Sequence, residues 1–296
     1  MIEIVNLVKR FGPVAAVDHL SVEIKPGVTG LVGHNGAGKS TLFRLISDIY
    51  SVDEGQILID GIDHREVEAK KKVFFLNDNP YGLGNWKQTY DFYANFYEID
   101  LEKYEGLINS WGLPKNKEIR LFSKGMRRQL FIALALSVKC DVLLMDEAFD
   151  GIDPLILELI RKEISALSDD GKAIVISSHN ISSLERLVDR FLILYKGQLS
   201  KEGESEHMGE QMVKFQCVVS GKELSEKDLS SLGLSIVNFR RIGSIYNFVI
   251  IETPDCESKI KESLTPTLLE RVPIDPDEIV MLEMMLAKKK GDSKHE

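Results

Sequence analysis

The chain has few cysteines and no long apolar run. Its three cysteines, Cys140, Cys217 and Cys256, are an odd number without a CxxC spacing, so neither a disulfide framework nor a zinc site is predicted. No apolar stretch approaches the roughly 20 residues that a membrane-spanning helix needs. The first residues are typical of a strand rather than of an export signal. We therefore expect a protein of a reducing compartment that serves a membrane only by docking onto another chain.

The chain also lacks an excess of basic residues. It carries 37 Lys and Arg against 46 Asp and Glu, a net charge of −9, and no basic stripe with interleaved aromatics is visible. We therefore expect no nucleic-acid partner, and we interpret the lysine run at 288–290 as a solvated tail. The hydrophobic content of 44% is that of an ordinary globular protein, and 296 residues suffice for a main domain with a smaller one attached.

Hydrophobic periodicity divides the chain into two parts. Residues 1–205 alternate strands and helices as in a parallel α/β sheet, interrupted by a helical insertion at about 80–138. Within this part we expect a helix over 40–50, with Ile49 on its apolar face, and another over 181–188. Residues 206–296 follow the order βαββαβ, which predicts a small ferredoxin-like α/β domain with a further helix at its end.

The strongest local motif is a glycine-rich loop between an apolar strand and a helix. It fits the GxxxxGK[ST] phosphate-loop pattern, or Walker A motif. Its backbone N–H groups and the helix start would surround phosphates, Lys39 would add a full charge, and Ser40 would offer a hydroxyl to Mg²⁺. The candidate nucleotide-binding residues here are Gly33, His34, Asn35, Gly36, Ala37, Gly38, Lys39, Ser40 and Thr41.

An acidic pair follows a second apolar strand. Asp146 and Glu147 come directly after residues 141–145, where the carboxyl end of a parallel strand would present them at the mouth of the sheet. We interpret Asp146 as a ligand of Mg²⁺, directly or through water, and Glu147 as the general base that activates the attacking water. Without the phosphate loop, a solvated acidic pair would be the simpler interpretation.

Further motifs narrow the many classes of phosphate-loop protein to one. Residues 121–129, Leu-Phe-Ser-Lys-Gly-Met-Arg-Arg-Gln, resemble the signature motif of ATP-binding cassette (ABC) proteins. That family also carries a D-loop, matched by Gly151-Ile152-Asp153, and a switch histidine, matched by His179. Phe11 occupies the place of the family's adenine-stacking aromatic, although an isolated phenylalanine would more often be a core or turn packing residue. The resemblance covers roughly residues 1–205.

The resemblance implies a fold, a reaction and partners. The fold would be the ABC ATPase domain over 1–205, with a parallel core sheet, an antiparallel β subdomain and a helical insertion, followed by the small domain over 206–296. The protein would hydrolyse ATP with Mg²⁺ in a head-to-tail dimer of two cassettes, identical or paralogous. Ser123 and Gly125 would reach the γ-phosphate bound by the partner, His179 would bond the same phosphate, and Asp153 would belong to the nucleotide-binding set.

One position departs from the family pattern. After the strand at 73–76 the family usually places a glutamine that touches Mg²⁺, and the alignment puts Asp78 there. A carboxylate can ligate Mg²⁺ but adds negative charge beside the γ-phosphate. Asp78 is therefore a candidate metal ligand, and a plain loop acid is an equal alternative.

Three functions compete at this level. The first is the ATPase subunit of a transporter with a separate transmembrane permease, peripheral on the inner face of the cell membrane; the signature spelling and the small C-terminal domain resemble bacterial exporters of drugs, peptides or ions. The second is a soluble ABC ATPase that acts on ribosomes or DNA, for which one set of motifs in 296 residues is a poor match. The third is a phosphate-loop kinase or GTPase, which would not carry a signature motif.

Overall fold

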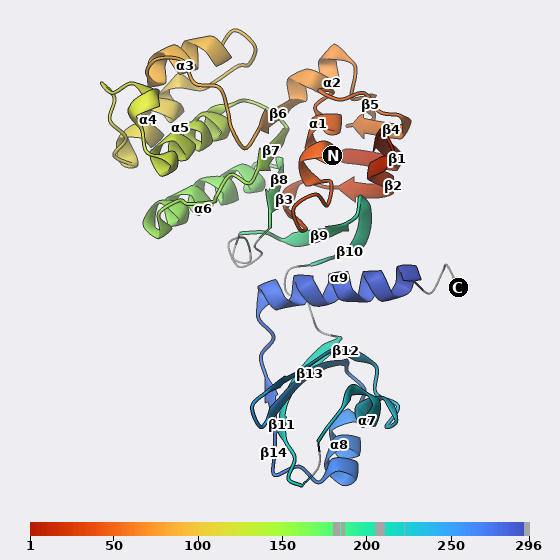
Figure 1. The fold of residues 1–296 in the computed structure, drawn as a ribbon. Coiled ribbons are helices and arrows are strands. Elements are labelled where there is room, and N and C mark those ends of the chain that lie inside the picture. The colour runs from red at the N-terminus through yellow and green to blue at the C-terminus, as the bar shows by residue number, and fades with distance from the viewer. Residues whose placement is uncertain (180–183, 185–186, 205–210, 222, 293–296) are drawn as a thin grey trace. The chain divides into compact units, whose positions relative to one another are not determined.

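The chain forms two compact units, Met1–Ser205 and Glu206–Glu296 (Figure 1). The structure is a computed structural model and describes residues 1–179, 184, 187–204, 211–221 and 223–292. Most of the helix expected over 181–188 lies outside these ranges. The first unit contains two sheets and the second contains one, and each unit has its own core.

A six-stranded sheet forms the centre of the first unit (Figure 1). Five strands are parallel, and β10, which the sequence patterns did not predict, joins the edge in the antiparallel direction. The strands are fully or largely buried apart from β10, as expected for a parallel sheet covered on both faces. In sheet order they are β10 (Gln198–Glu204), β9 (Arg190–Tyr195), β3 (Gly27–Val32), β8 (Ala173–Ser178), β7 (Val142–Asp146) and β6 (Val73–Leu76).

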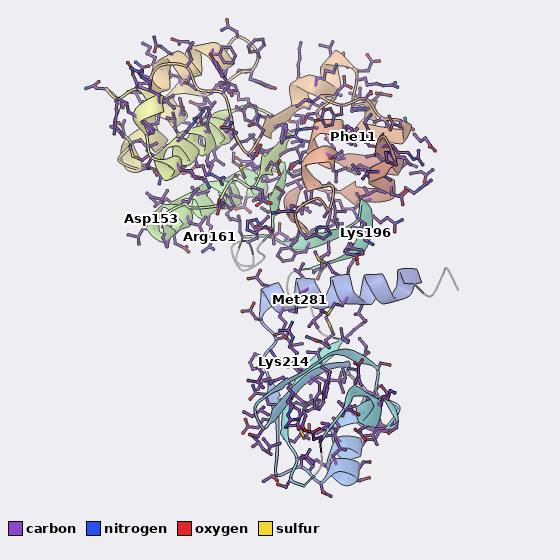
Figure 2. All side chains as sticks on the ribbon, in the orientation of Figure 1. Phe11, Asp153, Arg161, Lys196, Lys214 and Met281 are labelled. Carbon is purple, nitrogen blue, oxygen red and sulfur yellow. The ribbon has the colours of Figure 1, made fainter. Side chains whose placement is uncertain are left out.

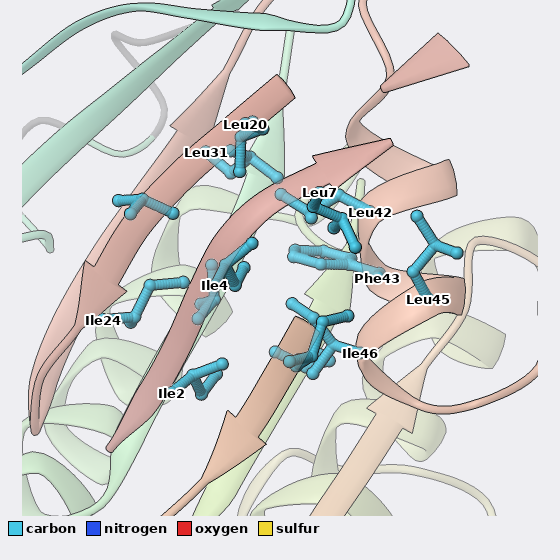
Figure 3. Close-up of a cluster of buried hydrophobic side chains, with 14 of the residues drawn as sticks. Ile2, Ile4, Leu7, Leu20, Ile24, Leu31, Leu42, Phe43, Leu45 and Ile46 are labelled. Atoms are coloured by element: carbon cyan, nitrogen blue, oxygen red, sulfur yellow. The ribbon is translucent and has the colours of Figure 1, made fainter. Parts of the chain in front are cut away.

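A second, antiparallel sheet shares the core of the first (Figure 3). Its strands, in the order β2-β1-β4-β5, are β2 (Val14–Ile24), β1 (Ile2–Phe11), β4 (Glu54–Ile59) and β5 (Ile62–Asp63). Apolar side chains from this sheet meet those of α1 (Lys39–Ile46) and the facing side of the parallel sheet in one buried cluster. Since β-strand side chains alternate, Val142 and Leu144 enter this cluster while Leu143 and Met145 are buried on the opposite face.

Helix α1 is shorter than the apolar pattern predicts. It ends at Ile46, and Asp48 has a left-handed backbone with φ of 52°. Because the chain turns there, Ile49 is left exposed, so its predicted place on the buried face was wrong. The four-residue shortfall arises because periodicity does not register a break that the following turn imposes.

The helical insertion follows β6 and a loop. Helix α3 begins with a capping box, in which Asn85 accepts from the backbone of Gln88 and the Gln88 side chain accepts from the backbone N–H of Asn85. Helix α5 begins at the candidate signature motif, where the hydroxyl of Ser123 accepts from the N–H of Met126 at 3.2 Å. Besides α1, the described helices of this unit are α2 (Val67–Lys72), α3 (Trp86–Tyr93), α4 (Leu101–Ser110), the 3₁₀ turn η1 (Ile119–Leu121), α5 (Lys124–Ser137) and α6 (Pro154–Asp169).

The second unit has the predicted ferredoxin-like order. Its four strands are antiparallel in the order β12-β13-β11-β14, which places the first and third strands at the centre. Separate apolar clusters form around Phe215 and Phe248 and around Val249 and Leu282, the second including residues of α9. The elements are β11 (Met212–Val218), α7 (Glu226–Ser230), β12 (Ile236–Ile242), β13 (Ile245–Ile251), α8 (Cys256–Leu264), β14 (Leu268–Val272) and α9 (Pro276–Asp292).

The three cysteines are buried and unbridged. Burial raises the pKa of the Cys140 thiol to about 11, so this thiol stays protonated at neutral pH. Cys140, two residues before strand β7, therefore serves as a packing residue.

We predict that Phe43→Ala destabilises the first unit by about 3–5 kcal/mol, because this fully buried ring lies within the core shared by the two sheets. Phe96→Ala is the matched control, since its side chain is 67% exposed, and we expect a change below about 0.5 kcal/mol. Chemical denaturation of both variants measures the difference. Equal losses from the two variants would show that the Phe43 ring is not part of a tightly packed core.

Candidate functional site

The carboxyl ends of three parallel strands meet around one pocket. Strand β8 lies between β3 and β7, with Val32 paired to Ser178 and Asp146 paired to Ser177. The glycine-rich loop leaves β3, the acidic pair ends β7, and His179 follows β8. The pocket has a volume of about 500 Å³ and is lined by Ala16, His34, Asn35, Gly36, Ala37, Gly38, Lys39, Ser40, Thr41, Asp78, Arg128, Glu147, Asp150 and His179.

The glycine-rich loop wraps tightly before α1. Gly38 has a φ of 108°, and a Cβ at this position would lie 2.3 Å from the carbonyl oxygen of Ala16, so only glycine fits without a shift of backbone. No side chain caps the first turn of α1, which leaves its N–H groups for an anion. The Lys39 ammonium is buried and donates to the carbonyl of Gly33 at 2.6 Å. This geometry fits a row of phosphates.

Asp146 is fully buried at the end of β7. Its Oδ1 accepts from the hydroxyl of Ser177 at 2.5 Å, while Oδ2 has no hydrogen-bond partner among the described residues. An unpartnered buried carboxylate oxygen is costly unless a cation or a water completes it. Asp146 thus has the environment expected of a side chain that helps to hold a cation.

Glu147 is held at four points in a strained conformation. Its φ is 48°, which costs about 1–2 kcal/mol in a residue other than glycine. Its N–H donates to Ser177 Oγ at 2.9 Å, and its carbonyl accepts from Arg128. The two carboxylate oxygens lie 3.4 Å from Lys39 Nζ and 2.8 Å from His179 Nδ1. Strain kept in place by surrounding contacts is typical of a functional site.

The donor set suits Mg²⁺ only together with phosphate. No group of three His, Cys, Asp or Glu side chains in the described part of the chain is arranged to hold a metal. Ser40 and Asp78 line the pocket, and buried Asp146 directly precedes the lining residue Glu147 and has one oxygen without a partner among the described residues. Mg²⁺ ordinarily binds through one or two protein ligands, phosphate oxygens and water, so these residues fit the ion.

Six predicted residues do not line this pocket, namely Phe11, Gly33, Ser123, Gly125, Asp146 and Asp153. Ser123 and Asp153 cap α5 and α6, and Gly125 sits in the first turn of α5, where a Cβ would approach the carbonyl of Gly151 at 3.1 Å. Phe11 ends β1 with its ring 47% exposed and 5.5 Å from that of Tyr50. Figure 2 labels Phe11 on the antiparallel sheet and Asp153 at the start of α6.

Sequence reasoning missed four contributors to the site. Ser177, one residue before Ser178 and His179, bonds both members of the acidic pair. Arg128 and Asp150 line the pocket, and the Lys124 ammonium holds the pKa of Asp150 below its ordinary value. Ala16 also lines the pocket, and its carbonyl oxygen lies close to Gly38. The sequence signal for Ser177 and Arg128 was their place within motifs, which by itself does not indicate their contacts.

Comparison with known proteins places these motifs in one family. The family described as ABC transporter matches residues 17–150. The ABC transporter ATP-binding protein YtrB from Bacillus subtilis is 26% identical over 285 residues, covering 94% of this chain and 96% of its own length. The ABC transporter ATP-binding protein MJ1023 from Methanocaldococcus jannaschii is 30% identical over 236 residues, 76% of this chain and 86% of its own length.

Solved structures show the same fold. The dimeric structure of MJ0796, described as a bacterial ABC transporter cassette, matches with a TM-score of 0.62 over 69% of this chain and 99% of that chain, at 21% identity. About two thirds of the present chain matches almost the whole MJ0796 chain. The similarity is therefore limited to one cassette. The predicted cassette fold is confirmed.

We predict that Ser177→Ala lowers the free energy of unfolding of the first unit by about 1–3 kcal/mol, because it leaves a buried carboxylate oxygen and the N–H of Glu147 without their partner. Ser137→Ala is the control: this hydroxyl is also buried, but it donates to the Ala133 carbonyl one turn earlier in α5. Urea denaturation compares the two. A loss from Ser177→Ala no larger than that from Ser137→Ala would contradict the expected role.

Proposed function

Because the chain belongs to the ATP-binding proteins of ABC transporters, a family of ATPase cassettes, we propose that it couples ATP hydrolysis to transport through a separate membrane-spanning subunit. The observation that carries the proposal is the convergence of Lys39, Glu147 and His179 on one pocket bounded by the phosphate loop. These groups come from three strand ends, and together they supply charge, a base and a hydrogen-bond donor to a nucleoside triphosphate.

The proposed reaction is attack of water on the γ-phosphate of ATP, which breaks its bond to the bridging oxygen of the β-phosphate and releases ADP and phosphate. Lys39 would exchange its contacts with the Gly33 carbonyl and Glu147 for contacts with the outer phosphates. An ammonium binds a charged phosphate more strongly than it binds a neutral carbonyl. Glu147 would then accept the proton of the attacking water, a role worth about 10²–10⁴ in rate. His179, 2.8 Å from Glu147, would donate to the γ-phosphate and so respond to its loss.

A metal ion completes the proposed site. Mg²⁺, when bound, would neutralise charge on the outer phosphates. We assign Ser40, Asp146 and Asp78 to hold it, directly or through water. The free oxygen of buried Asp146 supports its assignment, and Asp78 lines the same pocket. A carboxylate at position 78, where the family usually has glutamine, would add negative charge next to the γ-phosphate.

The other half of the site would come from a second cassette. Ser123 and Gly125 do not line the pocket of their own chain. Ser123 offers a hydroxyl and Gly125 an N–H in the first turn of α5, both suited to phosphate. A head-to-tail dimer would bring them to the nucleotide held by the partner, with Phe11 stacking on the adenine and Asp153 near the interface. The similarity to a dimeric cassette supports this arrangement.

Mixing two inactive variants tests the shared site. Lys39→Ala and Ser123→Arg should each be inactive, whereas a mixed dimer rebuilds one intact site and should recover up to about half of the wild-type activity per dimer. Differently tagged chains, purified through both tags, provide the mixed dimer for an ATPase assay. Lys39→Ala mixed with itself is the control. Verified mixed dimers without activity would contradict a composite site.

A membrane partner is proposed from an exposed apolar surface. No described helix is long and apolar enough to span a bilayer. The helical insertion exposes Tyr81, Leu83 and Phe96, and the ring of Phe92 lies 5.4 Å from that of Tyr81 and 5.6 Å from that of Phe96. Exposed aromatic groups of this kind favour a protein contact. This surface would hold the permease on the inner face of the membrane.

The direction of transport is also a proposal. The signature spelling and the small second domain support export of a drug, peptide or ion. The similarity to YtrB covers 94% of this chain and therefore includes the second unit. This supports a transporter subunit of the same subgroup as YtrB. A soluble ABC ATPase remains the competing function, and the presence of a permease distinguishes the two.

We predict that detergent extraction with tagged protein recovers a multi-span membrane protein, and that Tyr81→Ser with Phe96→Ser reduces its recovery by about tenfold. Val67→Ser is the control, because Val67 is an equally exposed apolar residue on α2. Mass spectrometry of the extracts measures recovery. Only soluble partners, or equal recovery by all variants, would contradict the proposed docking surface.

A further inference from the structure

Two basic residues of the signature helix reach the segment that follows the catalytic strand. Lys124 and Arg128 are four residues apart on α5 and so share one face. Lys124 Nζ lies 2.9 Å from Asp150 Oδ2, and Arg128 Nη2 lies 3.7 Å from the same oxygen. The other terminal nitrogen of Arg128, Nη1, donates to the carbonyl of Glu147. Residues 147–150 are therefore joined to the start of α5 by these two cations.

The two cations differ in what they can do. The Lys124 side chain is 70% exposed, so its ion pair with Asp150 is screened by solvent. The Arg128 side chain is only 15% exposed, and its planar guanidinium bonds a carbonyl and faces a carboxylate at once. Arg128 is thus the member whose contacts bear on the position of Glu147.

The carbonyl bond acts on the backbone of Glu147. This residue is held with a φ of 48°, its N–H bonded to Ser177 and its carbonyl bonded to Arg128, so the peptide groups on both sides of its Cα are fixed. Loss of either bond would let the strained backbone relax toward an ordinary conformation. A rotation there moves the carboxylate at the tip of the side chain, and a misplacement of about 1 Å can reduce a rate roughly 10²-fold.

We propose that Arg128 is a positioning residue that holds Glu147 in its reactive orientation and joins it to the signature helix of the same chain. The inference rests on the proposed ATPase function. Because Ser123 and Gly125 begin the same helix, a phosphate bound there from the partner site would act on this chain's own Glu147 through Arg128. Arg128 also lines the nucleotide pocket, so direct contact with phosphate is the alternative that an experiment must separate.

A double-mutant cycle between Arg128 and Glu147 tests the proposal. Single-turnover and steady-state ATP hydrolysis are measured for wild type, Arg128→Gln, Glu147→Gln and the double variant. We expect Glu147→Gln to lower the rate by about 10²-fold or more and Arg128→Gln to lower kcat by about 10-fold to 10²-fold. If Arg128 acts through Glu147, the double variant should hydrolyse ATP within about twofold of Glu147→Gln alone.

Two further variants control for folding and for general loss of a guanidinium. Arg127→Gln removes a neighbouring arginine of α5 that donates to the Pro80 carbonyl at 3.1 Å, and its effect should multiply with that of Glu147→Gln. Arg128→Lys keeps a donor and should have at least about threefold more activity than Arg128→Gln. Thermal unfolding is measured throughout, and Arg128→Lys replaces Arg128→Gln in the cycle should the latter fail to fold.

The outcomes separate the alternatives. The proposal is supported if Arg128→Gln has a KM and an ATP affinity within about threefold of wild type and if the effects of Arg128→Gln and Glu147→Gln are non-additive in the cycle. A parallel loss of ATP affinity and kcat in Arg128→Gln would make Arg128 a direct phosphate ligand and overturn the proposal. Multiplicative effects in the double variant, or an unchanged kcat, would also overturn it. A wild-type protein without ATPase activity would instead refute the proposed function.

Discussion

The parallel pairing of β3, β8 and β7 is the constraint on which the site depends. Asp146 pairs with Ser177, and Val32 with Ser178, so the phosphate loop, the acidic pair and His179 leave the sheet at one edge. These strands are buried on both faces, and a slip of one residue would reverse which side chains enter each core. The packing of the apolar residues thereby sets the positions of the polar ones.

The same edge carries backbone strain and a buried side-chain oxygen that has no partner among the described residues. Glu147 occupies the left-handed region and Asp146 keeps one buried oxygen without a bond. Each feature costs free energy, and neighbouring side chains hold both residues in place: Ser177 bonds the other oxygen of Asp146 and the N–H of Glu147, and Arg128 bonds the Glu147 carbonyl. The core that extends through two sheets and α1 stabilises the fold and offsets these costs.

The two halves of the candidate nucleotide site lie on different parts of one cassette. The pocket side is built at strand ends, whereas Ser123 and Gly125 lie at the start of a helix of the insertion and do not line that pocket. In the proposed dimer, a site divided in this way would be complete only when two chains meet, which would give dimerisation a direct chemical consequence. Arg128 is the one pocket residue that comes from the signature helix, so it links the two halves within a chain.

Sequence by itself determined the order of the elements, the phosphate loop, the acidic pair and the ferredoxin-like second domain, because each depends on local periodicity or on a motif of fixed spacing. Only the tertiary structure decided where α1 ends, since the turn at Asp48 leaves Ile49 exposed. It also decided the contacts of Ser177 and Arg128 with the acidic pair, 30 and 19 residues away in the chain from Glu147. Such contacts arise from strand register and helix packing between distant segments, for which a single sequence carries no local signal.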